Sequence, residues 1–162
     1  MTGVQRFLAP SDFSAAGTWR LVEWCKGVGA DEFTIDCLAP DAIGVPEVWR
    51  GFDQMVQPFS REEGVRERMS GATADELTRS TRLWELNVNT IQALHKVLPD
   101  GLFGYNPAEH GWFEDPVFYR DGRLMLGILS HEAFAVLRLS NSESEELAAA
   151  GFPSHESLPR AR

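Results

Sequence analysis

The fold is decided by residues 116–139, PVFYRDGRLMLGILSHEAFAVLRL. Asp121-Gly122 lies between two runs of β-favouring residues, and this dipeptide favours a two-residue type I′ hairpin turn because Gly tolerates positive φ. A second reversal near residues 130–132 would turn the chain back once more. The stretch therefore predicts a three-stranded antiparallel meander, and we expect the rest of the chain to pack around it.

The register of this meander follows from the tight turn, because a one-residue shift would move every side chain to the other face. The turn and the second reversal predict four cross-strand pairs: Tyr119–Leu124, Val117–Leu126, Leu126–Leu137 and Leu124–Leu139. One face of the meander is then wholly apolar and needs a cover. Its residues are Val117, Tyr119, Leu124, Leu126, Ile128, Ala135, Leu137 and Leu139.

The opposite face carries a second apolar patch, which arginine side chains surround. The apolar residues are Phe118, Met125, Leu129, Phe134 and Val136, and the arginines are Arg120, Arg123 and Arg138. Gly127 leaves a dent beside Val136. Aromatic, Met and Arg side chains are enriched at protein interfaces, so the patch with Arg138 is a candidate interface. The alternative is internal cover, by the N-terminal residues or by the loop at 101–115.

The rest of the chain predicts two further strands and four helices. In chain order they are an N-terminal hairpin with strands at 19–25 and 33–38, then helices at 47–57, 60–71, 73–98 and 143–150. The register of the hairpin keeps Cys25 and Cys37 too far apart to form a disulfide, so both are expected to be free thiols. The helix at 73–98 is the longest and is expected to cover the sheet.

The order strand, strand, helix, helix, helix, strand, strand, strand, helix predicts the α+β class. We expect a single antiparallel sheet of about five strands with helices packed mainly on one face. A chain of 162 residues is long enough for one sizeable core, so residues 1–162 are expected to form a single globular domain. Residues 1–17 would be an N-terminal arm, and residues 152–162 a flexible tail.

The charge balance is acidic, with 15 Lys and Arg against 24 Asp and Glu and a formal net charge of −9. This balance argues against binding to nucleic acid or to an anionic membrane surface, favours solubility, and leaves a basic protein partner open. The chain carries neither a signal-peptide pattern nor an apolar run of about 18 residues. A cytoplasmic location is therefore expected.

The loop at 101–115 is the first place to look for chemistry, because aromatic and titratable residues alternate there. Its candidate catalytic residues are Tyr105, Glu109, His110 and Asp115. A His beside carboxylates can act as a general base or bind a metal. The alternative is that the aromatic residues fasten the loop to the core while the polar residues face water.

Recognisable motifs for other chemistry are missing from the sequence. The four His and two Cys residues do not fall at zinc-finger spacing, and neither a G-x-S-x-G motif nor a phosphate-binding glycine loop occurs. No metal and no cofactor are expected. The sequence predicts a non-catalytic protein-interaction or binding module that binds a basic protein partner or a second copy of the chain, as a homodimer. The alternative is a small enzyme or small-molecule-binding domain with its site in the 101–115 loop.

Overall fold

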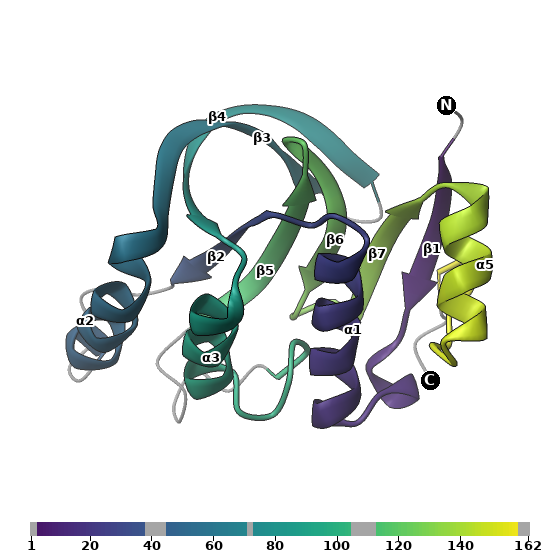
Figure 1. The fold of residues 1–162 in the computed structure, drawn as a ribbon, viewed down its shortest axis with the longest axis horizontal. Helices are drawn as coiled ribbons and strands as arrows, with labels where there is room; N and C mark the ends of the chain where they lie inside the picture. Colours follow the sequence, from purple (N-terminus) through teal and green to yellow (C-terminus); the bar gives the residue numbers. More distant parts are fainter. Residues whose placement is uncertain (1–2, 38–44, 71–72, 105–112, 159–162) are drawn as a thin grey trace.

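The computed structural model describes residues 3–37, 45–70, 73–104 and 113–158. In these residues the chain forms one antiparallel sheet of seven strands, in the order β1-β7-β6-β5-β2-β4-β3, together with four α-helices (Figure 1). The strands are β1 (Val4–Leu8), β2 (Glu32–Cys37), β3 (Ser60–Ser70), β4 (Thr73–Glu85), β5 (Phe113–Arg120), β6 (Arg123–Leu129) and β7 (Phe134–Leu139). The helices are α1 (Ala15–Gly27), α2 (Val45–Val56), α3 (Val88–Val97) and α5 (Asn141–Ala149). The predicted α+β class with one antiparallel sheet is confirmed, but the sheet has seven strands instead of five.

The central meander is formed by β5, β6 and β7, as the sequence predicts. Asp121 and Gly122 have φ angles of 50° and 73°, so both central residues of the turn adopt the positive φ that a type I′ turn requires. The pair Tyr119–Leu124 is present across this turn. The pair Leu126–Leu137 is present between β6 and β7. These two predicted pairs are confirmed.

A bulge in β6 overturns the predicted pair Val117–Leu126. Leu126 lies opposite Phe118, and Val117 lies opposite Gly127, so Met125 is an extra residue without a partner on β5. The extra residue breaks the alternation of β6, so Tyr119 and Leu124 no longer share a face with Leu126 and Leu137, and β5 presents the opposite faces to those predicted. Phe118 joins the main core instead of the second face, whereas Val117 packs in a separate cluster on the second face.

The predicted N-terminal hairpin at 19–25 and 33–38 is wrong in its first half. Residues 15–27 form helix α1, whose N-cap Ser14 accepts a hydrogen bond from the Gly17 N–H at 3.0 Å. The buried residues of α1 recur at helical spacing and are Thr18, Trp19, Leu21, Val22 and Cys25. Apolar residues also alternate along 19–25 in a way that would fit pairing with 33–38. This pattern does not decide the structure, because burial against the sheet follows the helical period. Cys25 is a free thiol, as predicted, but lies buried in this helix.

The helices predicted at 60–71 and 73–98 are also wrong over most of their length. Residues 60–70 and 73–85 are strands β3 and β4, which pair with each other as a long antiparallel hairpin. Weak helix formers such as Thr78, Ser80 and Thr81 favour this outcome, and pairing between the two strands outweighs the helical preference of the other residues. Only residues 88–97 of the predicted long helix are helical, as α3.

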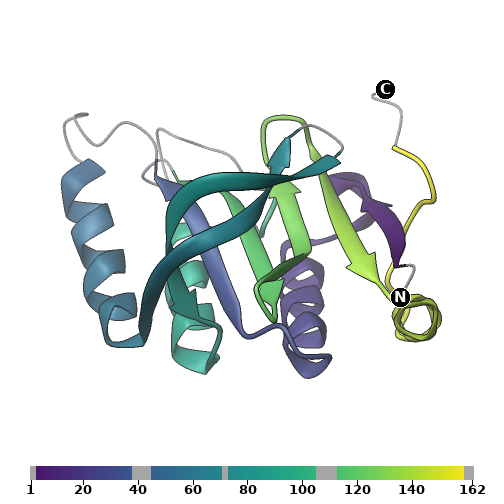
Figure 2. The ribbon, with the colours of Figure 1, turned by 90° about the horizontal axis from the view of Figure 1, so that it is seen from above.

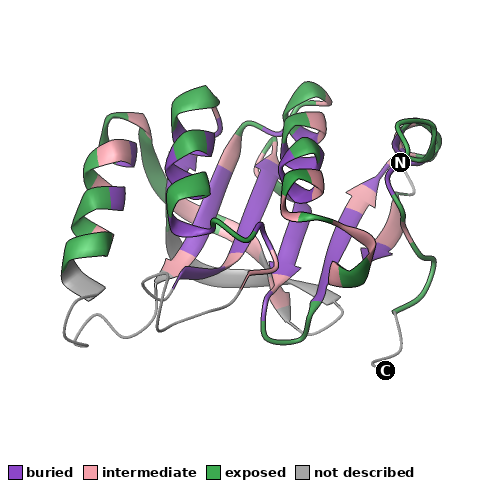
Figure 3. Cartoon of the chain, turned by 90° about the horizontal axis from the view of Figure 1, so that it is seen from below, coloured by how far each residue is buried: buried purple, intermediate pink, exposed green. Residues whose placement is uncertain are grey.

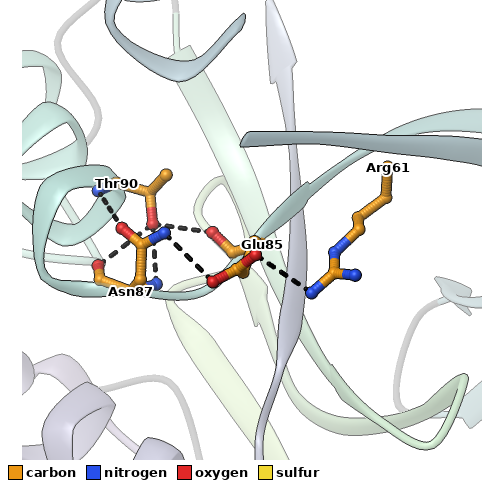
Figure 4. A network of polar contacts seen from close by, with 4 residues as sticks. All are labelled: Arg61, Glu85, Asn87 and Thr90. Atoms are coloured by element: carbon orange, nitrogen blue, oxygen red, sulfur yellow. Dashed lines mark hydrogen bonds and ion pairs between the residues drawn. The ribbon is translucent and has the colours of Figure 1, made fainter. Parts of the chain in front are cut away.

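A local hydrogen-bond network ends β4 and begins α3 (Figure 4). The side chain of Asn87 accepts hydrogen bonds from the backbone N–H groups of Asn89 and Thr90 at 3.0 and 3.1 Å, and the Thr90 hydroxyl accepts one from the Asn87 N–H at 2.9 Å. Glu85 accepts hydrogen bonds from Asn87 at 3.3 Å and from Arg61 of β3 at 3.1 Å. The network therefore has a structural role, because it satisfies the free N–H groups of the first helical turn.

Helices and hairpin cover opposite faces of the sheet. Helices α1, α2 and α3 lie on one face, and the β3–β4 hairpin arches over the other (Figures 1 and 2). The sheet between them is buried along its middle strands, whereas the outer sides of the helices are exposed (Figure 3). The main core on the helical side includes Leu21, Phe33, Leu94, Phe118 and Leu137. Two smaller clusters lie on the hairpin side. The prediction of helices mainly on one face holds, but the hairpin was not foreseen.

Both termini are more ordered than predicted in the residues that the structure describes. The expected arm at 1–17 contains β1, which pairs with β7, and also the start of α1. In the expected tail at 152–162, Phe152 is buried and His155 forms a β-bridge with Phe7. The last helix is confirmed at 141–149, and its capping box is formed by Ser140 with Glu143.

Candidate functional site

The apolar residues of the predicted interface are covered within the protein, whereas Arg138 remains partly exposed. Phe118 and Met125 are 0% and 1% exposed in the main core. Phe134 and Val136 are buried with Phe7 on the second face, where Leu129 and Met69 of the hairpin pack against them. Of the two interpretations that the sequence left open, internal cover describes these apolar side chains. The cover includes the β3–β4 hairpin, which neither interpretation named.

Met69 occupies the dent that Gly127 leaves in the sheet. A Cβ atom at Gly127 would lie 2.5 Å from Cγ and 2.9 Å from Sδ of Met69. Further along the hairpin, Arg66 forms an ion pair with Glu32 of β2 at 2.9 Å, and the Tyr119 hydroxyl donates to the Glu67 carbonyl oxygen at 2.9 Å. The hairpin is therefore fastened to the sheet by packing and by polar contacts.

The arginines of the predicted patch remain accessible and line an open groove with a volume of about 670 Å³. We call it the arginine groove. Its charged residues are Glu67, Arg120, Asp121, Arg123 and Arg138. Its apolar wall is formed by Leu124, Met125 and Leu139. Gly3 and Ser140 complete the lining. Arg120, Arg123 and Arg138 come from three different strands, so only the sheet brings them together.

The arginine groove opens where β6 and β7 stop pairing. The ladder between these strands runs from Leu129–Phe134 to Leu126–Leu137. The predicted pair Leu124–Leu139 is not part of it, although both residues belong to strands. The bulge at Met125 accounts for this separation, because an extra residue bends a strand and increases its twist. The groove is thus a consequence of the same irregularity that exchanged the faces of β5.

Two of the three arginines have carboxylate partners. Arg120 forms an ion pair with Glu143 of α5 and donates to the carbonyl oxygen of Val28 at 3.0 Å. The hydrogen bond from Arg120 holds the pKa of Glu143 below its usual value. Arg138 donates to Oε2 of Glu67 at 3.0 Å. Arg123 is exposed at the start of β6, on the rim of the groove.

The loop candidates are only partly within the described residues. Tyr105, Glu109 and His110 lie outside them. Asp115 lies at the start of β5, where its carboxylate accepts a hydrogen bond from the Ser130 N–H at 2.7 Å and its N–H donates to the Ser130 hydroxyl at 3.2 Å. This reciprocal pair ties the beginning of β5 to the turn after β6. Asp115 therefore has a structural role in the turn.

A His–carboxylate pair exists next to Asp115, but it involves residues that the sequence did not single out. His131, which the sequence places in a turn, forms an ion pair with Glu114, whose side chain is only 6% exposed. Burial raises the pKa of Glu114, and the negative charges of Asp115 and Asp36 act in the same direction, whereas the nearby His131 lowers it. Cross-strand pairing of Asp36 with Glu114 could have indicated this cluster only after the order of the strands was known.

The raised pKa of Glu114 predicts how the variant Glu114→Gln will respond to pH. The unfolded chain titrates this group near its ordinary value of 4.5, and the folded protein titrates it at a higher pH. The folded state therefore binds the proton more tightly, so the wild-type protein loses stability as the pH rises through this interval. Glu114→Gln cannot undergo this loss. We expect its stability relative to the wild type to increase from pH 4 to pH 8, as urea unfolding would measure.

The matched control for this prediction is Glu145→Gln, because Glu145 is an exposed carboxylate on α5. This variant removes the same charge without changing the cluster at Glu114. A stability difference between Glu114→Gln and the wild type that stays constant with pH, or that falls as the pH rises, would contradict the prediction.

Other kinds of site find no support in the described residues. No three His, Cys, Asp or Glu side chains gather there in a way that could hold a metal ion. Among the helices that the structure describes, none has the length and apolar character needed to cross a membrane. The arginine groove is therefore the candidate site. No protein-family model, curated protein or solved structure matches the chain.

Proposed function

We propose that the protein is a non-catalytic binding module that holds an anionic group in the arginine groove. The observation that carries this proposal is the convergence of Arg120, Arg123 and Arg138 on one groove, in a chain with a net charge of −9. In an acidic protein, repulsion would keep anions away unless cations are concentrated locally. The groove volume of about 670 Å³ also falls within the range of small-ligand sites, about 300–1,000 Å³.

The arginines differ in their contacts and exposure, and this difference supports the proposed function. Arg120 and Arg138 are held in place by Glu143 and Glu67, so little side-chain freedom is lost when a ligand binds near them. Arg123 is exposed, and its guanidinium group can donate several hydrogen bonds to one anion. The lining contains three cations and the carboxylates of Glu67 and Asp121, and Glu143 pairs with Arg120 from outside the lining. Arg123 is therefore the cation that supports anion binding most directly.

Substitution of Arg123 tests the proposal directly, with inorganic phosphate as the probe. We expect Arg123→Ala to weaken phosphate binding roughly tenfold, because a hydrogen bond to a charged group contributes about 1.5–3 kcal/mol. Isothermal titration calorimetry at constant ionic strength measures the dissociation constant. The control is Lys96→Ala, which removes an exposed positive charge from α3. Equal dissociation constants for the wild type and both variants would overturn the proposal.

The basic protein partner and the homodimer expected from the sequence are further proposals. Exposed carboxylates on α5, Glu145 and Glu146, favour the basic partner. Light scattering of the protein alone, and after addition of polylysine, tests both. A monomeric mass that polylysine does not change would count against them, and would leave the arginine groove as the proposed site.

A further inference from the structure

The side chain of Glu67 occupies one wall of the arginine groove, and its contacts indicate what the groove is suited to bind. We infer that the groove is a carboxylate site and that Glu67 is its internal occupant in the unliganded protein, where it competes with a carboxylate ligand. This inference rests on the proposed function and adds to it the chemical class of the ligand and a means of regulation.

A single oxygen of Glu67 accepts two hydrogen bonds. Oε2 accepts one from the backbone N–H of Leu124 at 2.9 Å and one from the guanidinium of Arg138 at 3.0 Å. A backbone N–H beside a guanidinium is a complete set of donors for one carboxylate oxygen. The donor at Leu124 is available because the β6–β7 ladder ends at Leu126–Leu137. We call this place, defined by Leu124 and Arg138, the carboxylate position.

The carboxylate that fills this position comes from another part of the chain. Glu67 belongs to the β3–β4 hairpin, whereas Leu124 and Arg138 belong to the meander beneath it. The Glu67 side chain is 22% exposed, so solvent reaches it from the groove. A ligand carboxylate can therefore replace Glu67 at the same donors without opening the core. Release of Glu67 would remove one of the polar contacts that fasten the hairpin to the sheet.

The surroundings of the carboxylate position specify the rest of the ligand. Arg123 adds a second cation on the rim. The apolar residues of the lining, Met125 and Leu139, are only 1% and 2% exposed, so they shape the groove without offering apolar surface to a ligand. The ligand class is a small organic carboxylate, which places its charge at the donors of Leu124 and Arg138.

Replacement of Glu67 by Ala tests the inference, because acetate matches the part of the side chain that the substitution removes. We expect acetate to bind Glu67→Ala roughly tenfold more tightly than it binds the wild type, as calorimetry or chemical-shift titration would measure at constant ionic strength. Acetate should also raise the melting temperature of Glu67→Ala more than that of the wild type. Acetamide, which has the same shape without the charge, should do neither.

The double variant Glu67→Ala/Arg138→Ala identifies the position of the bound acetate, because it lacks one of the two donors. We expect its affinity for acetate to fall to that of the wild type. If Glu67→Ala does not fold, Glu67→Gln keeps the shape of the side chain without its charge, and acetate should bind that variant at least about threefold more tightly than the wild type. Equal acetate affinities for the folded variant and the wild type overturn the inference.

The result can be separated from a failure of the proposed function. Phosphate binding that depends on Arg123, together with equal acetate affinities, would leave the proposed function standing and remove the carboxylate position. Phosphate binding that does not depend on Arg123 would remove the proposed function. Acetate binding to Glu67→Ala would then still establish Glu67 as the occupant of a carboxylate position.

Discussion

Phe118→Ala is expected to lower the free energy of unfolding by about 3–5 kcal/mol, the usual cost of truncating a buried Phe. Phe118 is fully buried in the main core, and its ring centroid lies 6.2 Å from that of Phe33 on the neighbouring strand. Truncation would leave a cavity between the sheet and the helices. For a chain of this length, a loss of this size lowers the melting temperature by roughly 10 °C. Urea unfolding and thermal melts monitored by circular dichroism measure both quantities.

This prediction separates the two interpretations of the arginine-rimmed patch. If Phe118 were exposed at an interface, Phe118→Ala would change the oligomeric mass of the protein and leave its free energy of unfolding nearly unaltered. The control is Val65→Ala, because Val65 is 62% exposed and its truncation should change the free energy of unfolding by less than about 0.5 kcal/mol. A loss for Phe118→Ala no larger than that of the control would mean that Phe118 is not in the core.

Gly127→Val is expected to destabilise the protein by about 1–3 kcal/mol, because it overfills a packed site. The new Cβ atom would lie 2.5 Å from Cγ of Met69, and Leu124 would also be in close contact, at 3.2 Å. Met69 must move, and the β3–β4 hairpin must move with it. Thermal unfolding measures the loss. Gly51→Ala is the matched control, since nothing lies within 4 Å of a Cβ atom at that position. Because Ala is a better helix former than Gly, this variant should raise the free energy of unfolding by about 0.5–1 kcal/mol.

A double-mutant cycle shows whether Met69 is the neighbour responsible. In the double variant Gly127→Val/Met69→Ala, the clash disappears with the Met side chain, so the combined loss should be smaller than the sum of the two single losses. Losses that add to within about 0.5 kcal/mol would show that residue 127 and Met69 do not touch. The hairpin would then not cover this face in the way described.

The candidate site was predictable in part. The sequence indicated that Arg120, Arg123 and Arg138 surround one face of the meander, because alternation along each strand follows from a known turn. In the structure they line one groove, but Arg120 contacts Glu143 on the helical side, whereas Arg138 contacts Glu67 of the hairpin. It did not indicate that the apolar residues between them are covered while the arginines remain open. Glu67 had been assigned to a helix, so its position at the groove was beyond reach. The pair of Glu114 with His131 was missed for a related reason, since the turn that carries His131 meets the start of β5 only in the folded sheet.

Local chemistry determined the meander, its tight turn and the final helix. Asp121-Gly122 adopts positive φ at both positions because few other dipeptides do so at low cost, and no distant contact is needed to select that turn. Tertiary structure alone decided that residues 15–27 are a helix and that residues 60–70 and 73–85 are paired strands. Those segments carry patterns compatible with either form, and the free energy of packing against the sheet exceeds their small intrinsic preferences. The extra residue at Met125 likewise has no signature in the sequence. It exchanged the faces of β5 because β6 has one residue more than β5 over the paired segment. The same extra residue bends β6, and this bend opens the arginine groove.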